Sequence, residues 1–329
     1  MPLGPTDDLV RRFRASLASL IGEDAAGSAI LTVAVSGGPD SLALLLLAAA
    51  ALRGRVSAAT VDHGLRPESA SEAAFVADVC GRLDVPHETL ALAWSPPRSN
   101  RQASARAARY ECLQAWAVER GADWLATAHH LDDQAETLLM RLHRGSGVDG
   151  LAGIRPKRPL AREGRGPILV RPLLGWRKDE LATLVRASGF VAIQDPSNSD
   201  PAHDRTGARA ALAASPKWPD RQRVANSADH LREVSEAMEW VTSDLLRRRV
   251  SADGEARVLA VHDLPPELLR RLAGRLVGIV GRSTASLRGD ELARAVATLS
   301  SGQVAALAEV VIRPRAGEWR FAPAPPRRA

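Results

Sequence analysis

The hexapeptide Ser36-Gly37-Gly38-Pro39-Asp40-Ser41 separates two apolar runs, residues 30–35 and 42–52. The first run is short and rich in β-branched residues, as in a strand, whereas the second is long enough for a helix. A loop of small residues between a strand and a helix exposes backbone amides that can bind a phosphate. The same residue types also favour an ordinary turn, so the loop alone leaves a purely structural role open.

The chemistry of this loop limits its ligand. A P-loop of the kinase or GTPase type follows GxxxxGK[ST] and carries a lysine for the terminal phosphates, and no lysine lies near this loop. Gly37 and Gly38 allow close backbone approach, while Ser36 and Ser41 add hydroxyl donors. Asp40 would repel a phosphate unless Mg²⁺ stood between them, so Asp40 is the candidate metal ligand.

The first two thirds of the chain alternate short apolar runs with longer helical patterns, which predicts an α/β fold. The order predicts a Rossmann-like parallel sheet with helices on both faces, in which ligands bind beyond the carboxyl ends of the strands. Expected strands are residues 30–35, 56–61, 87–92, 124–128 and 168–171, and expected helices are 42–52, 69–83, 101–120, 132–143 and 178–188. Residues 144–172 are expected to form mostly a long loop.

The last third is expected to be a smaller helical domain. Prolines at 216 and 219 indicate a boundary between residues 1–215 and 216–329. Helical spacing occurs at residues 224–249, 265–280 and 290–299, and the proline-rich stretch 322–329 predicts a disordered tail.

Charge is concentrated in this last third. Residues 216–329 hold 19 basic and 14 acidic side chains, which account for most of the net charge of +6. Such an excess is compatible with a nucleic-acid partner, although a solvated basic surface would give the same count.

Composition argues against several classes of protein. Cys80 and Cys112 are isolated, so neither a disulfide framework nor a zinc cluster is indicated. The N-terminal residues lack a signal-peptide core, and residues 42–52 are too short to span a bilayer. We therefore expect a cytoplasmic protein with no membrane association.

An acidic cluster follows the expected strand 124–128. Residues 127–137 read Thr-Ala-His-His-Leu-Asp-Asp-Gln-Ala-Glu-Thr. Either Asp133 with Glu136 or Asp132 with Glu136 would share a helical face, and acidic residues in a first turn are also favoured by the helix dipole. Two histidines and two aspartates would fit a metal-dependent phosphohydrolase as well, but the phosphate-type loop argues against that class.

Three further candidates are single side chains. His63 follows the expected strand 56–61, and its place beside the loop favours a catalytic histidine over an ordinary loop histidine. Arg106 and Arg109 are three apart on one helical face. Alone, these two arginines would be interpreted as a solvated stripe.

Together these segments resemble the tRNA(Ile)-lysidine synthetases, a family of PP-loop ATP pyrophosphatases. The resemblance covers roughly residues 28–210, and order and spacing agree throughout. Gln102 and Thr206 depart from the family's usual Glu and Asn, which leaves the roles of these positions open. Beyond the loop at Ser36, the matching segments are 61–69, 100–110, 127–137, Arg144-Gly145-Ser146-Gly147 with Gly150-Leu151, Arg171-Pro172-Leu173-Leu174, and Asp195-Pro196-Ser197-Asn198.

The resemblance implies a reaction. ATP adenylates the wobble cytidine in the CAU anticodon of tRNA(Ile), and the side-chain amine of free L-lysine displaces AMP to give lysidine, which changes codon reading from AUG to AUA. The loop would bind ATP and Asp40 would hold Mg²⁺. Asp133 and Glu136 would bind and deprotonate lysine, and Arg106 or Arg109 would neutralise phosphate charge. The C-terminal domain would bind the tRNA, and the family also allows a homodimer.

Three other kinds of protein are alternatives to a lysidine synthetase. A tRNA thiolase would place reactive cysteines near the site, whereas Cys80 and Cys112 fall in expected helices. An amidotransferase-linked ligase would carry a glutaminase domain before the loop. A non-catalytic RNA-binding protein would keep only the ATP fold.

Overall fold

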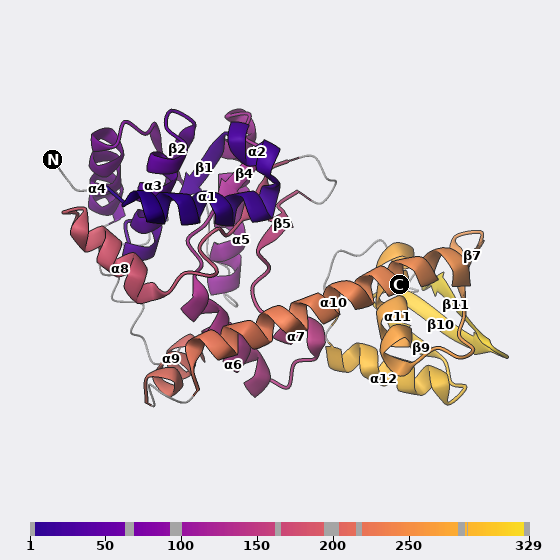
Figure 1. The fold of residues 1–329 in the computed structure, drawn as a ribbon. Coiled ribbons are helices and arrows are strands. Elements are labelled where there is room, and N and C mark those ends of the chain that lie inside the picture. Colours follow the sequence, from indigo (N-terminus) through magenta and orange to yellow (C-terminus); the bar gives the residue numbers. More distant parts are fainter. Residues whose placement is uncertain are drawn as a thin grey trace. The chain divides into compact units, whose positions relative to one another are not determined.

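The computed structural model describes residues 4–62, 69–92, 101–161, 166–193, 204–214, 219–281, 287 and 289–325. The chain forms two compact units, Met1–Arg141 with Gly153–Ala228 and Leu142–Ala152 with Asp229–Ala329 (Figure 1). The division falls inside helix α10 (Arg221–Arg249), beyond the proline-rich boundary at residues 215–219. The prolines at 216 and 219 precede α10 in the sequence, but the first turns of α10 belong with the first unit.

The first unit is built on a six-stranded sheet with the strand order β3-β2-β1-β4-β6-β5. Neighbouring strands are parallel except β5, which pairs antiparallel with β6. This confirms the expected α/β class. The strands are β1 Leu31–Ala34, β2 Val56–Asp62, β3 His87–Ala91, β4 Trp124–Ala126, β5 Lys157–Pro159 and β6 Ile168–Val170.

Helices cover both faces of this sheet. One apolar cluster joins β1 to α1, α3, α4 and α8, and a second packs α5 against β2, β4 and β6. Consecutive residues Ala58 and Ala59 of β2 belong to opposite clusters, as required of a strand buried on both faces. The helices are α1 Asp7–Ile21, α2 Glu23–Ser28, α3 Pro39–Ala51, α4 Ser69–Arg82, α5 Arg101–Glu119, α6 Leu131–His143, α8 Lys178–Ala187 and α9 Asp204–Ala214.

The strand order contains a switch point that positions the site. From β1 the chain proceeds outward through β2 to β3, then returns to place β4 on the other side of β1. The connections after β1 and β4 therefore diverge to opposite sides, which opens a crevice at their carboxyl ends. The loop at Ser36 follows β1, and the His129-His130 segment follows β4.

The second unit contains a five-stranded antiparallel sheet with the order β7-β8-β11-β10-β9. Helices α11 and α12 pack on one face of this sheet (Figure 1). Its elements besides α10 are α7 Val148–Leu151, β7 Val250–Asp253, β8 Ala256–Ala260, α11 Pro266–Gly281, α12 Gly289–Ser300, β9 Ala305–Leu307, β10 Val310–Arg315 and β11 Glu318–Pro323.

The sheet corrects the expectation of a purely helical C-terminal region. Helices α10, α11 and α12 lie where the spacing predicts them, but the strands are only three to six residues long and too short for periodicity to reveal. Ala322 and Pro323 belong to β11, so the predicted disordered tail is wrong for these two residues, which pair with β10. The stretch 144–172 likewise contains α7 and β5 as well as loop.

Candidate functional site

The loop at Ser36 is a tight turn between β1 and α3. Gly38 is the N-cap of α3 and Pro39 is its first residue, where the missing amide of proline costs nothing. The Ser36 amide donates to Ser41 Oγ at 3.2 Å, and the Ser41 hydroxyl donates to the Gly38 carbonyl at 3.0 Å. The Ser41 side chain therefore stabilises the turn through hydrogen bonds to its backbone. The first amides of α3 lie at the carboxyl edge of the sheet, where they can bind a phosphate.

Gly37 is required by the geometry of this turn. Its φ is +80°, a conformation that favours glycine. A Cβ at this position would lie 2.4 Å from Cδ1 of Ile193, whose amide donates to the Gly37 carbonyl at 2.9 Å. The positive φ therefore requires glycine here, and a Cβ would in addition displace the Ile193 side chain.

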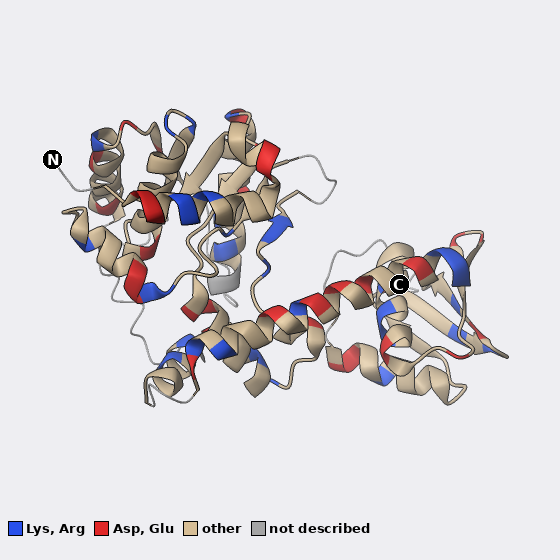
Figure 2. Cartoon of the chain, in the orientation of Figure 1, with Lys and Arg blue, Asp and Glu red and all other residues tan. Residues whose placement is uncertain are grey.

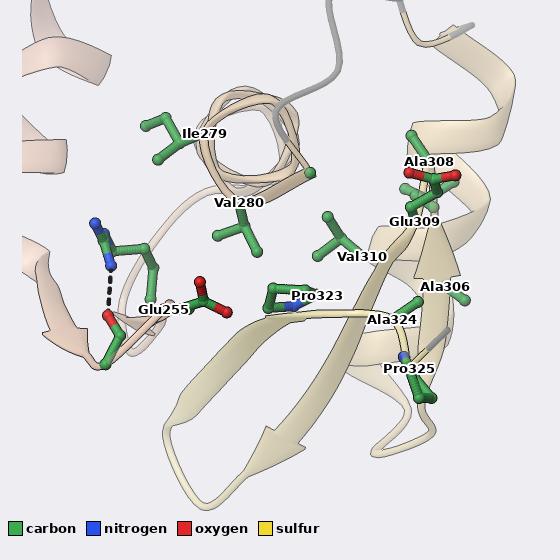
Figure 3. Close-up of a pocket in the computed structure, with 14 residues that line it drawn as sticks. Glu255, Ile279, Val280, Ala306, Ala308, Glu309, Val310, Pro323, Ala324 and Pro325 are labelled. Atoms are coloured by element: carbon green, nitrogen blue, oxygen red, sulfur yellow. Dashed lines mark hydrogen bonds between the residues drawn. The ribbon is translucent and has the colours of Figure 1, made fainter. Parts of the chain in front are cut away.

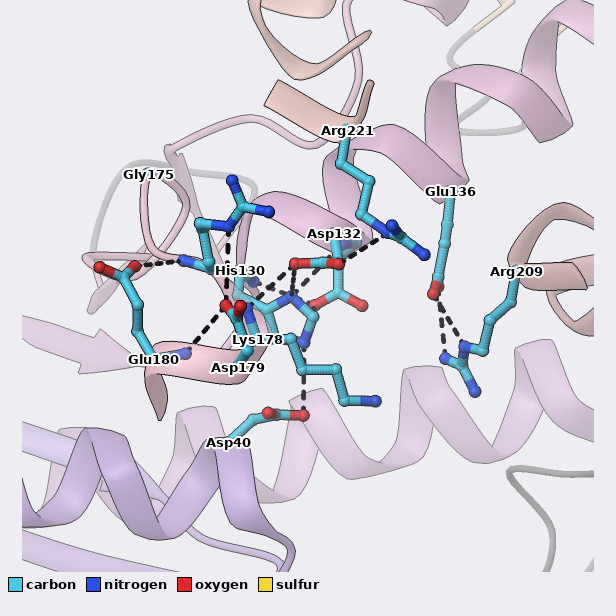
Figure 4. A network of polar contacts seen from close by, with 12 residues as sticks. Asp40, His130, Asp132, Glu136, Gly175, Lys178, Asp179, Glu180, Arg209 and Arg221 are labelled. Atoms are coloured by element: carbon cyan, nitrogen blue, oxygen red, sulfur yellow. Dashed lines mark hydrogen bonds and ion pairs between the residues drawn. The ribbon is translucent and has the colours of Figure 1, made fainter. Parts of the chain in front are cut away.

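His130 connects this loop to α6. Its Nε2 lies 3.4 Å from Asp40 Oδ2 and 3.7 Å from Asp133 Oδ2 (Figure 4). Burial alone would lower the pKa of His130, but the carboxylates of Asp40, Asp133 and Asp132 outweigh burial and raise the pKa above its usual value. His130 thus lies between the carboxylates of two segments and links them.

Asp40 retains an acceptor for a metal ion. Its buried Oδ1 atom has no hydrogen-bond partner in the described part of the chain. Residues with assigned positions contain no group of three or more His, Cys, Asp or Glu arranged as a metal site. Mg²⁺ bound with a nucleotide needs no such group, because one or two carboxylates plus phosphate oxygens and waters complete its coordination. Asp40 therefore fits a nucleotide-associated Mg²⁺.

Asp133 and Glu136 form one acidic pair, held by two arginines of α9. Arg205 bridges the pair, with Nη2 at 2.8 Å from Asp133 Oδ1 and Nε at 2.8 Å from Glu136 Oε2. Arg209 Nε lies 2.9 Å from Glu136 Oε1 (Figure 4). Burial would raise the pKa of Glu136, but Arg209 and Arg205 lower it below its usual value. The pair is therefore a strong cation site that arginines occupy here.

Asp132 has a different role from Asp133. Its Oδ2 accepts from the Lys178 amide at the start of α8 at 3.0 Å, and its Oδ1 lies 3.1 Å from Arg221 Nε. These contacts direct Asp132 toward α8 and α10. Of the two pairings that helical spacing allows, the structure thus brings together Asp133 and Glu136.

The predicted arginines lie in a basic cluster next to this network. Arg106 and Arg109 of α5 pack on the ring of Tyr110, and Arg106 Nη2 lies 3.5 Å from His129 Nε2. His129 precedes His130, so the cluster adjoins the Asp40 contact along the chain.

Several site residues were missed, and one candidate is not described. His63 and residues 194–203 lie outside the described residues, and so does the side chain of Gln102. Arg205 and Arg209 escaped prediction because they follow a polar, turn-rich stretch, although their spacing of four places both on one helical face. Thr206 lies between them on α9.

The second unit has a hollow of its own, between α11 and strands β10 and β11 (Figure 3). Apolar side chains such as Val280, Val310 and Pro323 line it together with Glu255 and Glu309. Its described lining contains no histidine or cysteine. The residues that bear the chemistry lie in the first unit.

The turn after β1, the switch point and the polar segment after β4 define a PP-loop protein. In agreement, a family model described as a PP-loop domain matches residues 9–215. The "tRNA(Ile)-lysidine synthase" of Zymomonas mobilis is 44% identical over 97% of this chain and 95% of its own length. The "tRNA(Ile)-lysidine synthase" of Novosphingobium aromaticivorans is 44% identical over 97% of this chain and 94% of its own length. The chain belongs to the tRNA(Ile)-lysidine synthase family, a group of ATP-using PP-loop enzymes.

A solved structure supports the fold. The U34-tRNA thiolase NcsA from Methanococcus maripaludis superposes with a TM-score of 0.57, covering 69% of this chain and 81% of the thiolase at 16% identity. At this identity the likeness concerns the fold alone. No helix among the described residues has the length and apolar character needed to cross a membrane.

Replacing Gly37 by alanine should destabilise the ligand-free protein by about 1–3 kcal/mol, because the new Cβ forces both φ strain and a clash with Ile193. Gly38→Ala is the matched control, since a Cβ there approaches only Ser36 Oγ, at 3.8 Å. Urea denaturation without nucleotide measures both. Equal stability of the two variants would contradict the account of Gly37.

Asp40→Asn should lower the pKa of His130, which NMR titration of the imidazole measures directly. A raised folded-state pKa contributes stability that is present below the usual value of 6.5 and is lost as pH rises through the folded-state value. The variant should therefore lose more stability at pH 6 than at pH 9. Asp179→Asn, at an exposed carboxylate of α8, should leave the titration unchanged; an unchanged titration in Asp40→Asn would refute the contact.

Proposed function

We propose that this protein joins L-lysine to the wobble cytidine of the CAU anticodon of tRNA(Ile), using ATP and an adenylated cytidine intermediate, and so forms lysidine in the cytoplasm. One observation carries the proposal most directly. His130 brings the phosphate-type loop, through Asp40, to the acidic pair formed by Asp133 and Glu136. A nucleotide site and a site for an ammonium group thereby become neighbours.

In the first step the carbonyl oxygen of the cytosine base attacks the α-phosphorus of ATP, and pyrophosphate leaves. The amides around Gly37 and Gly38 hold the departing phosphates. An amide-like carbonyl oxygen is a weak nucleophile, so positioning and charge stabilisation supply most of the acceleration. Mg²⁺, held by Asp40, would neutralise charge on the leaving pyrophosphate.

In the second step the lysine amine attacks the activated ring carbon, and AMP leaves. The ammonium of lysine matches the acidic pair, but it must displace Arg205 and Arg209, which occupy that pair at 2.8–2.9 Å. Displacement also changes the chemistry, because these arginines lower the pKa of Glu136. Once they withdraw, Glu136 becomes a better proton acceptor, as a general base requires.

Cysteine chemistry of the thiolase kind finds no support. Burial raises the pKa of the Cys80 thiol to about 12, and burial together with the charge of Glu119 raises the pKa of Cys112. Reactive cysteines need the opposite shift. These are the only two cysteines of the chain.

The second unit offers a surface for the tRNA. Arg313 of β10 lies directly opposite Arg320 of β11, and Arg315, two residues further along β10, lies opposite Glu318. Basic residues colour several segments of this sheet in Figure 2. Like charges directly opposite each other destabilise a sheet. Arg320 pairs with Asp253 at 2.7 Å, whereas Arg313 has no ion-pair partner within the described residues. An RNA backbone would supply the missing negative charge.

Incubation with ATP, Mg²⁺, labelled lysine and a tRNA(Ile) transcript should place the label on the wobble cytidine, which mass analysis of the anticodon fragment locates. Asp40→Asn should lower the initial rate at least about 100-fold, since one well-placed electrostatic group is worth that much. Asp179→Asn should retain the wild-type rate. No label in the tRNA with wild-type protein would refute the proposed function.

The combined substitution of Arg313 and Arg315 by glutamine should weaken tRNA binding several-fold and reduce its salt dependence by about two charges. ATP affinity should stay unchanged. The matched control is Arg294→Gln, at an exposed position on α12. These substitutions are sharper than truncation at residue 216, which would also remove Arg221 from Asp132. If Arg294→Gln weakened tRNA binding as much as the combined substitution does, this face of the sheet would not be the tRNA contact.

A further inference from the structure

Four arginines surround one tyrosine in the first unit. The guanidinium carbons of Arg106, Arg109 and Arg158 lie 5.3, 5.5 and 5.0 Å from the centre of the Tyr110 ring, and Arg171 hydrogen-bonds the Tyr110 side chain. The face of an aromatic ring attracts cations but supplies no net charge. Within the described residues, none of the four arginines forms an ion pair with a carboxylate. The cluster therefore has an excess of positive charge.

Burial makes this excess costly. Arg171 is only 4% exposed, and Arg109 Nε is buried with no hydrogen-bond partner among the residues that the structure describes. Burial lowers the pKa of Arg171, the contact with Tyr110 opposes this shift, and the charges of Arg158 and Arg106 lower the pKa further, so that the net direction is downward. Buried cations without a counter-ion are strongly destabilising. The buried Arg171 and the part-buried Arg109 and Arg158 therefore favour an anion beside them, and the exposed Arg106 adds a further donor.

His129 shows where an oxygen of that anion would bind. An arginine Nε always carries a hydrogen, and Arg171 Nε donates to His129 Nδ1 at 3.3 Å. Burial first and the surrounding arginines next lower the pKa of His129 far below its usual value, which favours a neutral ring. The Thr127 hydroxyl lies 3.0 Å from the same Nδ1 and can donate to it as Arg171 does, an arrangement that places the ring proton on Nε2. That Nε2–H faces Arg106 Nη2 at 3.5 Å. The Arg106 and His129 N–H groups are both hydrogen-bond donors and cannot bond to each other. An anionic oxygen placed between them would accept from both.

We propose, on the basis of the lysidine-forming function above, that Arg106, Arg158, Arg171 and His129 bind a backbone phosphodiester of the RNA beside the reacting cytidine. In this arrangement Arg171 is a positioning residue as well, because its hydrogen bond sets the tautomer of His129. The site would take one phosphate group with two or three bound oxygens, as forked guanidinium groups do.

Strand order separates Arg158 and Arg171 from the nucleotide loop, whereas His129 follows β4, the neighbour of β1. The nucleotide loop follows β1, whereas Arg158 lies on β5 and Arg171 directly follows β6. In the order β1-β4-β6-β5, β5 is three strands from β1, about 14 Å at the usual spacing. Phosphates held at the N-terminus of α3 stay on the β1 side, while an RNA strand that crosses the carboxyl edge reaches β6 and β5.

Fluorescence anisotropy with a labelled CAU anticodon stem-loop tests this proposal on the full chain. Arg158→Gln should weaken binding about tenfold and reduce the salt slope by about one, with ATP affinity within about twofold of wild type. Arg158→Lys should recover part of the loss. The matched control, Arg120→Gln, removes an ion-paired arginine of the same region and should bind as wild type does. Unchanged thermal unfolding would show that Arg158→Gln is folded.

A second arm identifies the phosphate. One uncharged methylphosphonate linkage on either side of the wobble cytidine should weaken wild-type binding about tenfold at one of the two positions, but should cost Arg158→Gln little more, because the same contact is already lost. The proposal would be overturned if the methylphosphonate and Arg158→Gln weakened RNA binding additively, or if neither weakened it. It would also be overturned if Arg158→Gln weakened ATP binding and left RNA binding unchanged. The readout is binding without turnover. If the protein forms no lysidine but its RNA binding still depends on this phosphate, the proposed function is rejected and the proposed phosphate site is retained.

Discussion

The contact between His130 and Asp40 is the interaction on which the site depends. It joins two segments that are ninety residues apart and that follow adjacent strands, β1 and β4. The parallel sheet brings the two segments to one edge, but a shared edge fixes positions only to within several ångströms. The buried imidazole of His130, whose pKa the three surrounding carboxylates raise, closes that distance. The loop at Ser36 and the acidic pair are consequently linked through one side chain.

Charge is compensated unevenly around this contact. The acidic pair is satisfied by Arg205 and Arg209, whereas the described residues of the arginine cluster at Tyr110 contain no counter-ion. Under the proposed function, the first arrangement lets arginines occupy the acidic pair until lysine binds, and the second awaits a phosphate. Both inferences follow from the cost of leaving buried charge unpaired.

The sequence predicted the α/β class and the loop because both depend on short-range signals. Gly37 needs only its own turn, and the alternation of apolar runs is local. The pairing of Asp133 with Glu136 was one of two alternatives. The bridge that Arg205 forms between Asp133 and Glu136, and the contacts of Asp132 with Lys178 and Arg221, distinguish them.

Long-range features could not be obtained in this way. The contacts of Arg209 with Glu136 and of Arg171 with His129 join residues 73 and 42 positions apart. The C-terminal sheet was missed for a related reason, since its short strands are stabilised by pairing across the unit and not by any pattern within one strand. The assigned roles of Asp40, Asp133, Glu136 and Arg109 remain predictions, and Arg106 is now proposed to bind a phosphate of the RNA instead of one of ATP.

The central claim is that the loop after β1 directs the breaking of ATP between its first and second phosphates for attack by an RNA base. Chromatography of labelled ATP products, in the presence of the tRNA(Ile) transcript and lysine, tests this claim most directly. The account predicts AMP and pyrophosphate, each in equal amount to the lysidine formed, and neither product above background when the RNA is omitted. Release of ADP and inorganic phosphate, or AMP formation independent of the RNA, would contradict it.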